Sequence, residues 1–175
     1  MTFKLISLLT SFPKSQYKAE SPRLYIFLSI QCYTLWKKFM EININCDLGE
    51  KSKLHSNKYD KDLLEIVNSA NIACGFHAGD EKTMRDTISI SKKNNVSIGA
   101  HPSFNDPENF GRKRLNLEKK EIQKLIVDQY NILQKIAVDL GERVTHIKPH
   151  GALNNMACED LDLANILAKT IYDLD

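Results

Sequence analysis

The run Asn71-Ile72-Ala73-Cys74-Gly75-Phe76 is apolar, has the length of a strand and leads directly to His77. Three further runs share this pattern and end before a titratable residue: Ile42–Cys46 before Asp47, Val96–Ala100 before His101, and His146–Pro149 before His150. The segments between the runs are long enough for helices, and this alternation predicts parallel strands joined by crossovers. Because the carboxyl ends of parallel strands share one ligand-binding rim, the sequence predicts an α/β fold that gathers these four side chains on one face.

The segments between the apolar runs have helical patterns. Between Asn116 and Gly141, apolar residues recur at spacings of three and four, which predicts an amphipathic helix with Gly141 as its C-terminal cap. Aspartates indicate the starts of three more helices: Asp80 for a helix through about Asn94, Asp60 for one through Val67, and Asp160 for one through Tyr172. We interpret the apolar stripes of these helices as contacts with the core.

The composition indicates a globular domain that acts on small molecules. The chain has 175 residues, 42% of them hydrophobic, and a net charge of +2. Because the Lys and Arg residues are scattered, the charge pattern favours neither nucleic acid nor a membrane as a partner. The four cysteines show no Cys-x-x-Cys spacing, which argues against a zinc knuckle or a disulfide framework and fits a cytoplasmic protein. No Gly-rich motif for the phosphates of ATP or a dinucleotide occurs in the sequence.

Residues 1–39 differ from the rest of the chain, because they lack a clear apolar period and the strand and helix pattern begins at Met40. The apolar stretch Leu24–Trp36 has 13 residues, whereas a membrane-spanning helix needs about 20. A signal peptide is an alternative, because Lys4 precedes the apolar segment Leu5–Leu9, but no small-residue cleavage site follows. We therefore expect an N-terminal extension at 1–39 and one α/β domain at 40–175, with Met40 as the natural start of translation.

Five segments of the chain carry a family resemblance. They are Asn45–Glu50, Ser69–Asp80, Gly99–Pro102, Phe110–Arg112 and Lys148–Leu153. In sequence and order they closely resemble the LamB/YcsF family, from about Met40 to the C-terminal end. The resemblance implies a (β/α) barrel of the glycoside hydrolase/deacetylase type. It also implies the reaction of the bacterial members, which are A subunits of 5-oxoprolinase: 5-oxo-L-proline (pyroglutamate) is opened to L-glutamate at the expense of ATP, with subunits B and C as partners.

Opening a lactam ring requires an activated water, a stabiliser for the oxyanion and a proton for the leaving nitrogen. As a hypothesis, Asp47 is the general base or a metal ligand, Lys148 stabilises the oxyanion and His150 is the acid. The predicted catalytic residues are Asp47, Glu50, His77, His101, Lys148 and His150, and the predicted substrate-binding residues are Asn45, Asn71, Asp80 and Arg112. Alternative interpretations are a helix cap for Asp80 and hydrogen bonds to loop backbone for Asn45 and Asn71.

A bound divalent metal ion is an open alternative. One carboxylate and two or three imidazoles can bind zinc or a similar ion, and the candidate ligands are Asp47, His77, His101 and His150. These residues follow four separate strands, and no His-x-x-x-His spacing joins them. The metal alternative corresponds to a metal-dependent deacetylase or another amide hydrolase on the same fold.

The resemblance covers only part of a barrel. The segment 40–175 holds about four strand and helix units, whereas family members continue through further units that close the barrel. The fourth strand would then have an open edge, and open edges favour self-association. A truncated, non-catalytic fragment or assembly element is therefore an alternative to an enzyme.

Overall fold

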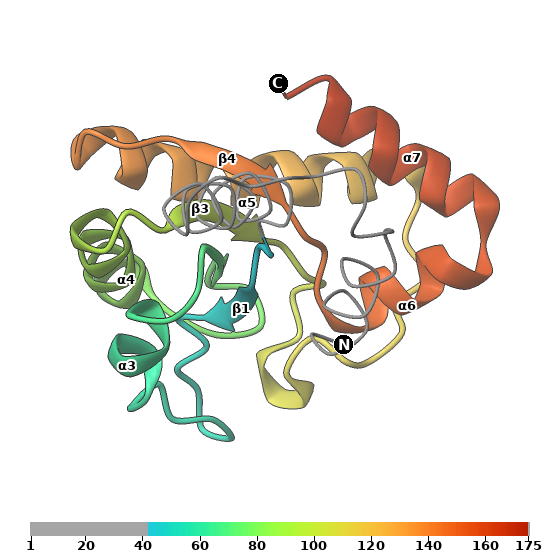
Figure 1. Ribbon diagram of the computed structural model, residues 1–175. Coiled ribbons are helices and arrows are strands. Elements are labelled where there is room, and N and C mark those ends of the chain that lie inside the picture. The colour runs from blue at the N-terminus through green and yellow to red at the C-terminus, as the bar shows by residue number, and fades with distance from the viewer. Residues whose placement is uncertain (1–41, 175) are drawn as a thin grey trace, which may run out of the picture. The chain divides into compact units, whose positions relative to one another are not determined.

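The computed structural model describes residues 42–174 and contains one four-stranded sheet (Figure 1). The strands are β1 (Asn45–Leu48), β2 (Ser69–Ala73), β3 (Ser97–His101) and β4 (Val144–Ile147). They pair in parallel in their order along the chain, which confirms the predicted α/β class. The interpretation of residues 1–39, with its start site and its signal-peptide alternative, lies outside the described residues.

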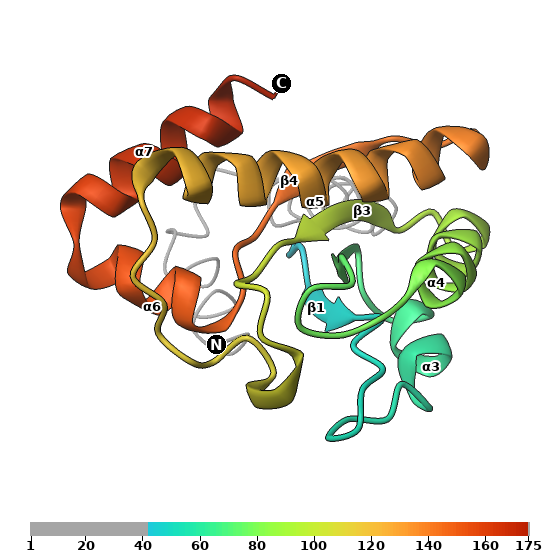
Figure 2. The same ribbon diagram turned by 180° about the vertical axis from the view of Figure 1, so that it is seen from behind.

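Helices connect consecutive strands and also follow the last strand. They are α3 (Asp60–Leu64), α4 (Glu81–Lys93), α5 (Lys119–Asp139), α6 (Gly151–Glu159) and α7 (Leu161–Tyr172), with a 3-10 turn at Pro107–Asn109. Figure 2 shows α5 running alongside β3 and β4. Among residues 42–174, no helix combines the length and apolar character that crossing a membrane requires.

Most of the predicted helix ends are confirmed. Asp80 caps α4 by accepting a hydrogen bond from the Thr83 N–H at 2.7 Å, and Asp160 caps α7 through the N–H groups of residues 162 and 163. Gly141 follows α5 with a φ of +74°, a conformation that terminates helices and that glycine adopts without strain.

The prediction for Asp60 is wrong. Asp60 is the first residue of α3, which ends at Leu64 and not at Val67, and its side chain makes no cap hydrogen bond. Its carboxylate instead accepts a hydrogen bond from the Gly49 N–H at 2.8 Å. A contact with the loop after β1 therefore replaces the predicted cap.

The two faces of the sheet differ in polarity. Because side chains alternate along a strand, Leu48, Ile72 and Ile98 point to one face and pack in a core with residues of α4 and α5. Asp47 and Asn71 are paired residues on the opposite, polar face. The same alternation explains how Asp47 can lie within β1, because a polar residue can occupy a strand position that faces the polar side of the sheet.

The strand ends differ from the predicted ones. Asp47 lies inside β1, one residue before its end, whereas His77 and His150 lie in the loops after β2 and β4. His101 is the last residue of β3. All four side chains nevertheless belong to the end of the sheet where the prediction placed them.

A β-bulge in β4 sets which side chains of this strand face the core. The register with β3 runs from Ile98–Val144 to Gly99–His146, which makes Thr145 an extra residue. The Thr145 hydroxyl donates a hydrogen bond to the Ile98 carbonyl at 3.0 Å. The bulge allows Val144 to join the core while His146, two residues later, turns to the polar face.

A second apolar cluster lies between α5 and the helices after β4. Its buried members include Phe104, Ile126, Leu153 and Leu167. In the first core, Cys74 is buried as a free thiol, and burial raises its pKa to about 12. This thiol is therefore a small hydrophobic residue and not a reactive one, as its position in an apolar run predicts.

Candidate functional site

A row of polar side chains crosses the sheet at one level. Asp47, Asn71, Gly99 and His146 are register partners on β1 to β4. The buried Asn71 amide donates hydrogen bonds to Asp47 Oδ1 and to Asn45 Oδ1, each at 2.9 Å. The Asn71 Oδ1 in turn accepts a hydrogen bond from His146 Nε2 at 3.1 Å. The Asn71 side chain thus joins Asn45, Asp47 and His146, and both its amide nitrogen and its oxygen have side-chain partners.

Gly99 leaves the space that the His146 ring occupies. A Cβ atom built on Gly99 would overlap the imidazole of His146. The ring therefore crosses over β3 only because residue 99 has no side chain, and this crossing brings Nε2 to Asn71. His146 had no predicted role, although a glycine within a strand signals close approach of another group.

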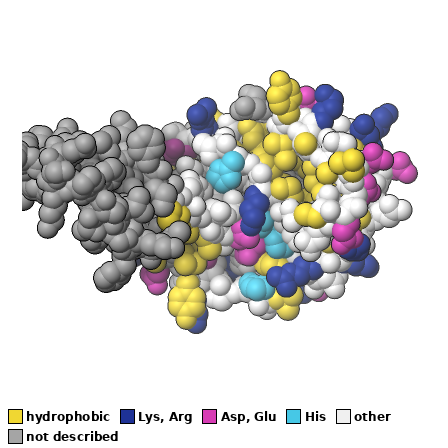
Figure 3. All heavy atoms as spheres, turned by 45° about the vertical axis from the view of Figure 1, so that its right-hand side comes forward, with side chains coloured by type: hydrophobic (Ala, Val, Ile, Leu, Met, Phe, Trp, Pro, Cys, Tyr) yellow, Lys and Arg dark blue, Asp and Glu magenta, His cyan; other side chains and the backbone are white. Residues whose placement is uncertain are grey.

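Asp47 and Lys148 form the more exposed part of the site. The Lys148 ammonium lies 2.6 Å and 2.7 Å from the two Asp47 oxygens, and the side chains of Lys148 and Asp47 are 46% and 33% exposed. Burial raises the pKa of Asp47, but His101, Lys148 and Asn71 together outweigh this effect and hold the pKa below its usual value. Asp47 is therefore an ionised carboxylate at neutral pH. On the face in Figure 3, basic, acidic and histidine side chains adjoin one another.

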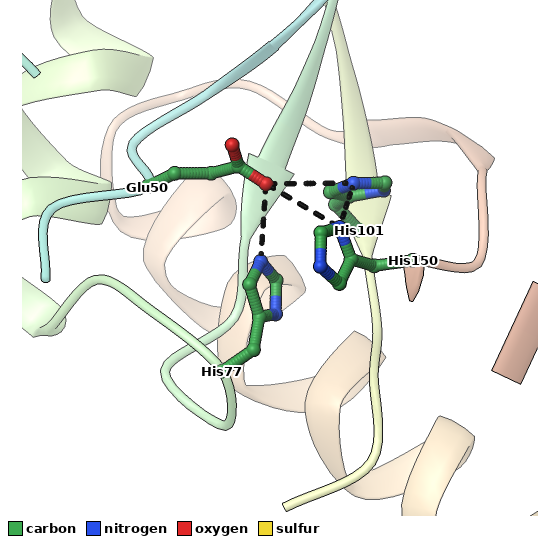
Figure 4. A group of neighbouring side chains, drawn as sticks. All are labelled: Glu50, His77, His101 and His150. Atoms are coloured by element: carbon green, nitrogen blue, oxygen red, sulfur yellow. Dashed lines mark hydrogen bonds and ion pairs between the residues drawn. The ribbon is translucent and has the colours of Figure 1, made fainter. Parts of the chain in front are cut away.

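Glu50, His77, His101 and His150 form the buried part of the site, and we call these four residues the histidine cluster (Figure 4). One ligand atom from each residue lies within 4.8 Å of the others, so the group could hold a metal ion. The three histidines are only 0%, 1% and 7% exposed, and the Glu50 side chain is 20% exposed. Glu50 reaches this position through Gly49, which has a φ of +70°.

Backbone carbonyls assign the tautomers of two of these histidines. The His101 Nδ1 lies 2.5 Å from the Lys148 carbonyl, and the His150 Nε2 lies 2.9 Å from the Phe110 carbonyl. Because a carbonyl only accepts, each of these nitrogens carries a proton and donates. The other ring nitrogens, His101 Nε2 and His150 Nδ1, face each other at 2.9 Å. In the neutral rings, each of the two facing nitrogens therefore carries a lone pair and no hydrogen.

His77 has a more adaptable partner. Its Nδ1 lies 2.8 Å from the Ser103 hydroxyl, and its Nε2 lies 3.2 Å from Glu50 Oε1. The same hydroxyl can donate to the Phe104 carbonyl at 2.9 Å, so Ser103 can serve His77 either as donor or as acceptor. No sequence signal marked Ser103, since its part here depends on how the loop after β3 folds back.

The environment favours neutral forms of His101 and His150 beside an ionised Glu50. Burial lowers the pKa of His101 to about 4, and it lowers the pKa of His150 as well. Burial also raises the pKa of Glu50, but the hydrogen bond with His77 and the neighbouring imidazoles outweigh it, so this pKa lies below its usual value. At neutral pH, the cluster thus offers nitrogen lone pairs and one negative charge.

Phe110 and Gly111 close one side of the histidine cluster. The Phe110 ring meets the rings of His77 and His150 edge-on, with centroids 5.3 Å and 5.1 Å apart. A Cβ on Gly111 would lie 3.0 Å from both of these histidines, so this glycine allows the loop to pack against them. His55, which had no predicted role, stacks on Phe110 with centroids 4.3 Å apart.

The structure brings most of the predicted site residues together. The six predicted catalytic residues form the pair Asp47–Lys148 and the adjoining histidine cluster, which the 3.5 Å contact between Asp47 Oδ2 and His101 Nε2 joins. One alternative predicted that Asn45 and Asn71 bond to loop backbone. The structure instead shows their side chains bonded to each other, and Asn71 bonded also to Asp47. Arg112 lies over the Phe110 ring at 5.4 Å. The cap interpretation of Asp80 is confirmed, and its role in substrate binding stays a prediction.

The comparisons with known proteins agree with one another. The model of the LamB/YcsF family matches residues 42–175. The A subunit of 5-oxoprolinase from Staphylococcus haemolyticus is 46% identical over 136 residues, which are 78% of this chain and 54% of that protein. The A subunit from Staphylococcus aureus strain Newman is 40% identical over the same shares of the two chains.

A solved structure supports the fold independently. The lactam utilization protein from Thermus thermophilus matches with a TM-score of 0.73 and 33% identity, over 78% of this chain and 55% of that one. The chain thus spans about half the length of the relatives that it matches. From its sequence motifs, its parallel sheet and these matches, the chain belongs to the LamB/YcsF family.

Proposed function

We propose that this chain provides the ring-opening site of an ATP-dependent 5-oxoprolinase, in which 5-oxo-L-proline is converted to L-glutamate. The relatives named as A subunits of 5-oxoprolinase support this assignment, as does the solved relative named for lactam utilization. The observation that carries the proposal is the half-exposed Asp47–Lys148 pair, which adjoins the histidine cluster. Since the matched residues are 54% of the Staphylococcus haemolyticus relative, the proposal concerns the part of the reaction to which these residues contribute.

The ion pair offers the two charges that the attack on a lactam carbonyl requires. The ionised Asp47 can accept a proton from a water molecule, while the Lys148 ammonium can stabilise the negative charge that develops on the carbonyl oxygen. Because both side chains are partly exposed, substrate groups can reach them. Asn71 holds Asp47 from the other side and thereby fixes the direction of its carboxylate.

The imidazoles can return the proton to the leaving nitrogen. Asp47 Oδ2 lies 3.5 Å from His101 Nε2, which in turn lies 2.9 Å from His150 Nδ1. A proton that Asp47 accepts therefore has a short path toward the rings, and it can be delivered to the amide nitrogen when the C–N bond breaks. Under this proposal, His150 is the acid and His101 passes the proton to it.

ATP and subunits B and C complete the proposal. The sequence contains no recognised phosphate-binding motif, so the partner subunits would supply the ATP site. The relatives are named as the A component of a multi-subunit enzyme, which implies such partners. A cytoplasmic location belongs to the same proposal, because the reaction consumes ATP.

The test is ATP-dependent release of glutamate from 5-oxoproline by the full chain mixed with B and C subunits of the family type. Asp47→Asn should abolish turnover, whereas Asp86→Asn, which alters an exposed aspartate on α4, should leave it unchanged. Turnover that survives Asp47→Asn would remove Asp47 from the mechanism. No turnover by the unchanged chain, with the Staphylococcus haemolyticus relative active in the same assay, would favour a non-catalytic fragment or assembly element.

A second candidate function is a metal-dependent deacetylase or other amide hydrolase on the same fold. The histidine cluster favours this candidate, because its residues could hold a metal ion. The two candidates differ in their requirements. Amide hydrolysis that needs a divalent metal but neither ATP nor partner subunits would support the second one.

A further inference from the structure

Two facing lone pairs at the centre of the histidine cluster require something between them. The carbonyls of Lys148 and Phe110 take the ring protons of His101 and His150, so the inward nitrogens of the neutral rings lie 2.9 Å apart without a hydrogen to share. Two lone pairs at hydrogen-bond distance repel each other. A cation or an added proton would turn this repulsion into attraction.

The carboxylate of Glu50 points to the same centre. Its Oε1 lies 3.2 Å from His77 Nε2, 3.4 Å from His150 Nδ1 and 3.7 Å from His101 Nε2. Ligand atoms about 2.1 Å from a tetrahedral zinc ion lie about 3.4 Å from one another. The distances from Glu50 therefore match the edges of such a tetrahedron, whereas the two facing nitrogens of His101 and His150, at 2.9 Å, would have to move apart to bind the ion. All four ligand atoms lie within 4.8 Å of one another.

The outer hydrogen bonds of the histidines are those of metal ligands. Metal-binding histidines usually donate their second ring N–H to a carbonyl, a carboxylate or water, which fixes the ring and its tautomer. Two backbone carbonyls do this for His101 and His150, and Ser103 can accept from His77 when its own hydrogen goes to Phe104. All three outer contacts leave the remaining nitrogen aimed at the centre.

From this geometry we propose that Glu50, His77, His101 and His150 bind one divalent transition-metal cation with the ligand preference of zinc. Glu50 takes the place that was predicted for Asp47, whose two oxygens are held by Lys148. Three imidazole nitrogens and one carboxylate favour zinc or cobalt over magnesium, which prefers oxygen ligands. A bound cation would occupy His101 Nε2 and His150 Nδ1, the two nitrogens of the proton path proposed above, so the inference rests on the second candidate function and competes with that path. Its test measures binding and does not depend on activity.

The test uses the full chain without a tag, treated with a chelator and then titrated with Zn²⁺ by calorimetry. We expect one Zn²⁺ per chain, weak binding of Mg²⁺, and a visible absorption spectrum with Co²⁺ that reports nitrogen and oxygen ligands at low coordination number. Absence of stoichiometric Zn²⁺ binding, with histidine NMR signals that indicate a shared proton between His101 and His150, would overturn the proposal.

Variants locate the bound ion. Glu50→Gln keeps the shape of the side chain and should weaken Zn²⁺ binding about tenfold or more, whereas Glu81→Gln on the surface of α4 should not change it. His55→Ala removes a histidine outside the cluster and should leave the stoichiometry at one. Circular dichroism verifies that each variant is folded. Equal Zn²⁺ affinity in Glu50→Gln and the unchanged chain would show that the ion binds elsewhere and would refute the assignment.

Ser103→Ala tests the outer hydrogen bond without removing a ligand. The variant takes away the acceptor for His77 Nδ1, and we expect it to weaken Zn²⁺ binding by about ten- to a hundredfold. The Co²⁺ spectrum should change little, because the ligands stay the same. An unchanged affinity would contradict the proposed orientation of His77.

Discussion

The Asp47–Lys148 pair and the histidine cluster touch each other but differ in their surroundings. The ion pair is partly exposed, so water or a substrate group can replace either partner at small cost in free energy. The three histidines are buried, and a polar group that loses its partner there costs much more. This difference fits the two proposals made above, in which the partly exposed ion pair meets the substrate and the buried cluster holds a bound cation.

The largest expected effect tests whether the ion pair is a chemical and not a structural feature. Lys148→Met removes the ammonium but keeps the backbone carbonyl that fixes His101. Turnover with subunits B and C should fall about a hundred- to a thousandfold. The free energy of unfolding, measured with urea, should change by less than about 1 kcal/mol.

The matched control for Lys148→Met is Lys82→Met, which removes a lysine from an exposed ion pair on α4. It should change neither turnover nor stability. The free energy of unfolding of Lys148→Met could instead fall by as much as the activation free energy rises. The ion pair would then support the fold, and its contrast with the buried cluster would not hold.

The next prediction concerns the pH dependence of stability in the buried cluster. The folded-state pKa of His101 is about 4, whereas an unfolded histidine has a pKa of about 6.5. As the pH falls from about 6.5 to 4, the unfolded state takes up the proton first, so the free energy of unfolding should decrease by about 3 kcal/mol over this range. The lowered pKa of His150 acts in the same direction.

Urea unfolding of the chelator-treated chain at several pH values measures this slope. The His101→Gln variant should show a flatter dependence between pH 6.5 and 4, because it lacks the group with the largest shift. The carboxylates Asp47 and Glu50 act in a lower range, since their lowered pKa values affect stability only near and below about pH 4. Equal slopes in the variant and the unchanged chain would contradict the assignment of this effect to His101.

The smallest expected effect concerns the polar row that supports Asp47. Gly99→Ala places a methyl group where the His146 ring lies, and it should reduce the free energy of unfolding by about 1–3 kcal/mol. Removing the ring in Gly99→Ala/His146→Ala should recover part of this loss, and the double-mutant cycle gives the coupling. Additive effects of the two changes would mean that the ring does not depend on the space above Gly99.

The sequence predicted the fold more fully than the site. Apolar runs separated by helical patterns indicated the parallel strands, and Asp80, Asp160 and Gly141 marked helix ends correctly because they act through local hydrogen bonds and backbone conformation. Asp60 has the same residue type as the correct caps, but a distant backbone N–H, that of Gly49, binds its carboxylate. Local patterns cannot reveal such a competition.

The site residues were predicted as a set but not in their arrangement. The rim argument gathered the histidines correctly, yet it could not tell that Glu50 and not Asp47 points to their centre. That outcome depends on the turn at Gly49 and on Lys148, which lies 101 residues after Asp47 in the chain. The sequence predicted no role for His146, because the direction of its side chain depends on the bulge in β4, and no residue type marks a bulge.

The bulge at Thr145 makes β4 sensitive to length rather than to composition. Loss of the bulge, with Thr145 kept in the strand, would restore regular alternation of side chains along β4. Val144 and His146 could then no longer point to opposite faces of the sheet. Either Val144 would leave the apolar layer or His146 would lose its contact with Asn71. A substitution in this strand therefore affects one side chain, whereas a single insertion or deletion beside the bulge changes the face to which every residue on one side of it points. Such a change can separate His146 from the polar row that contains Asn71.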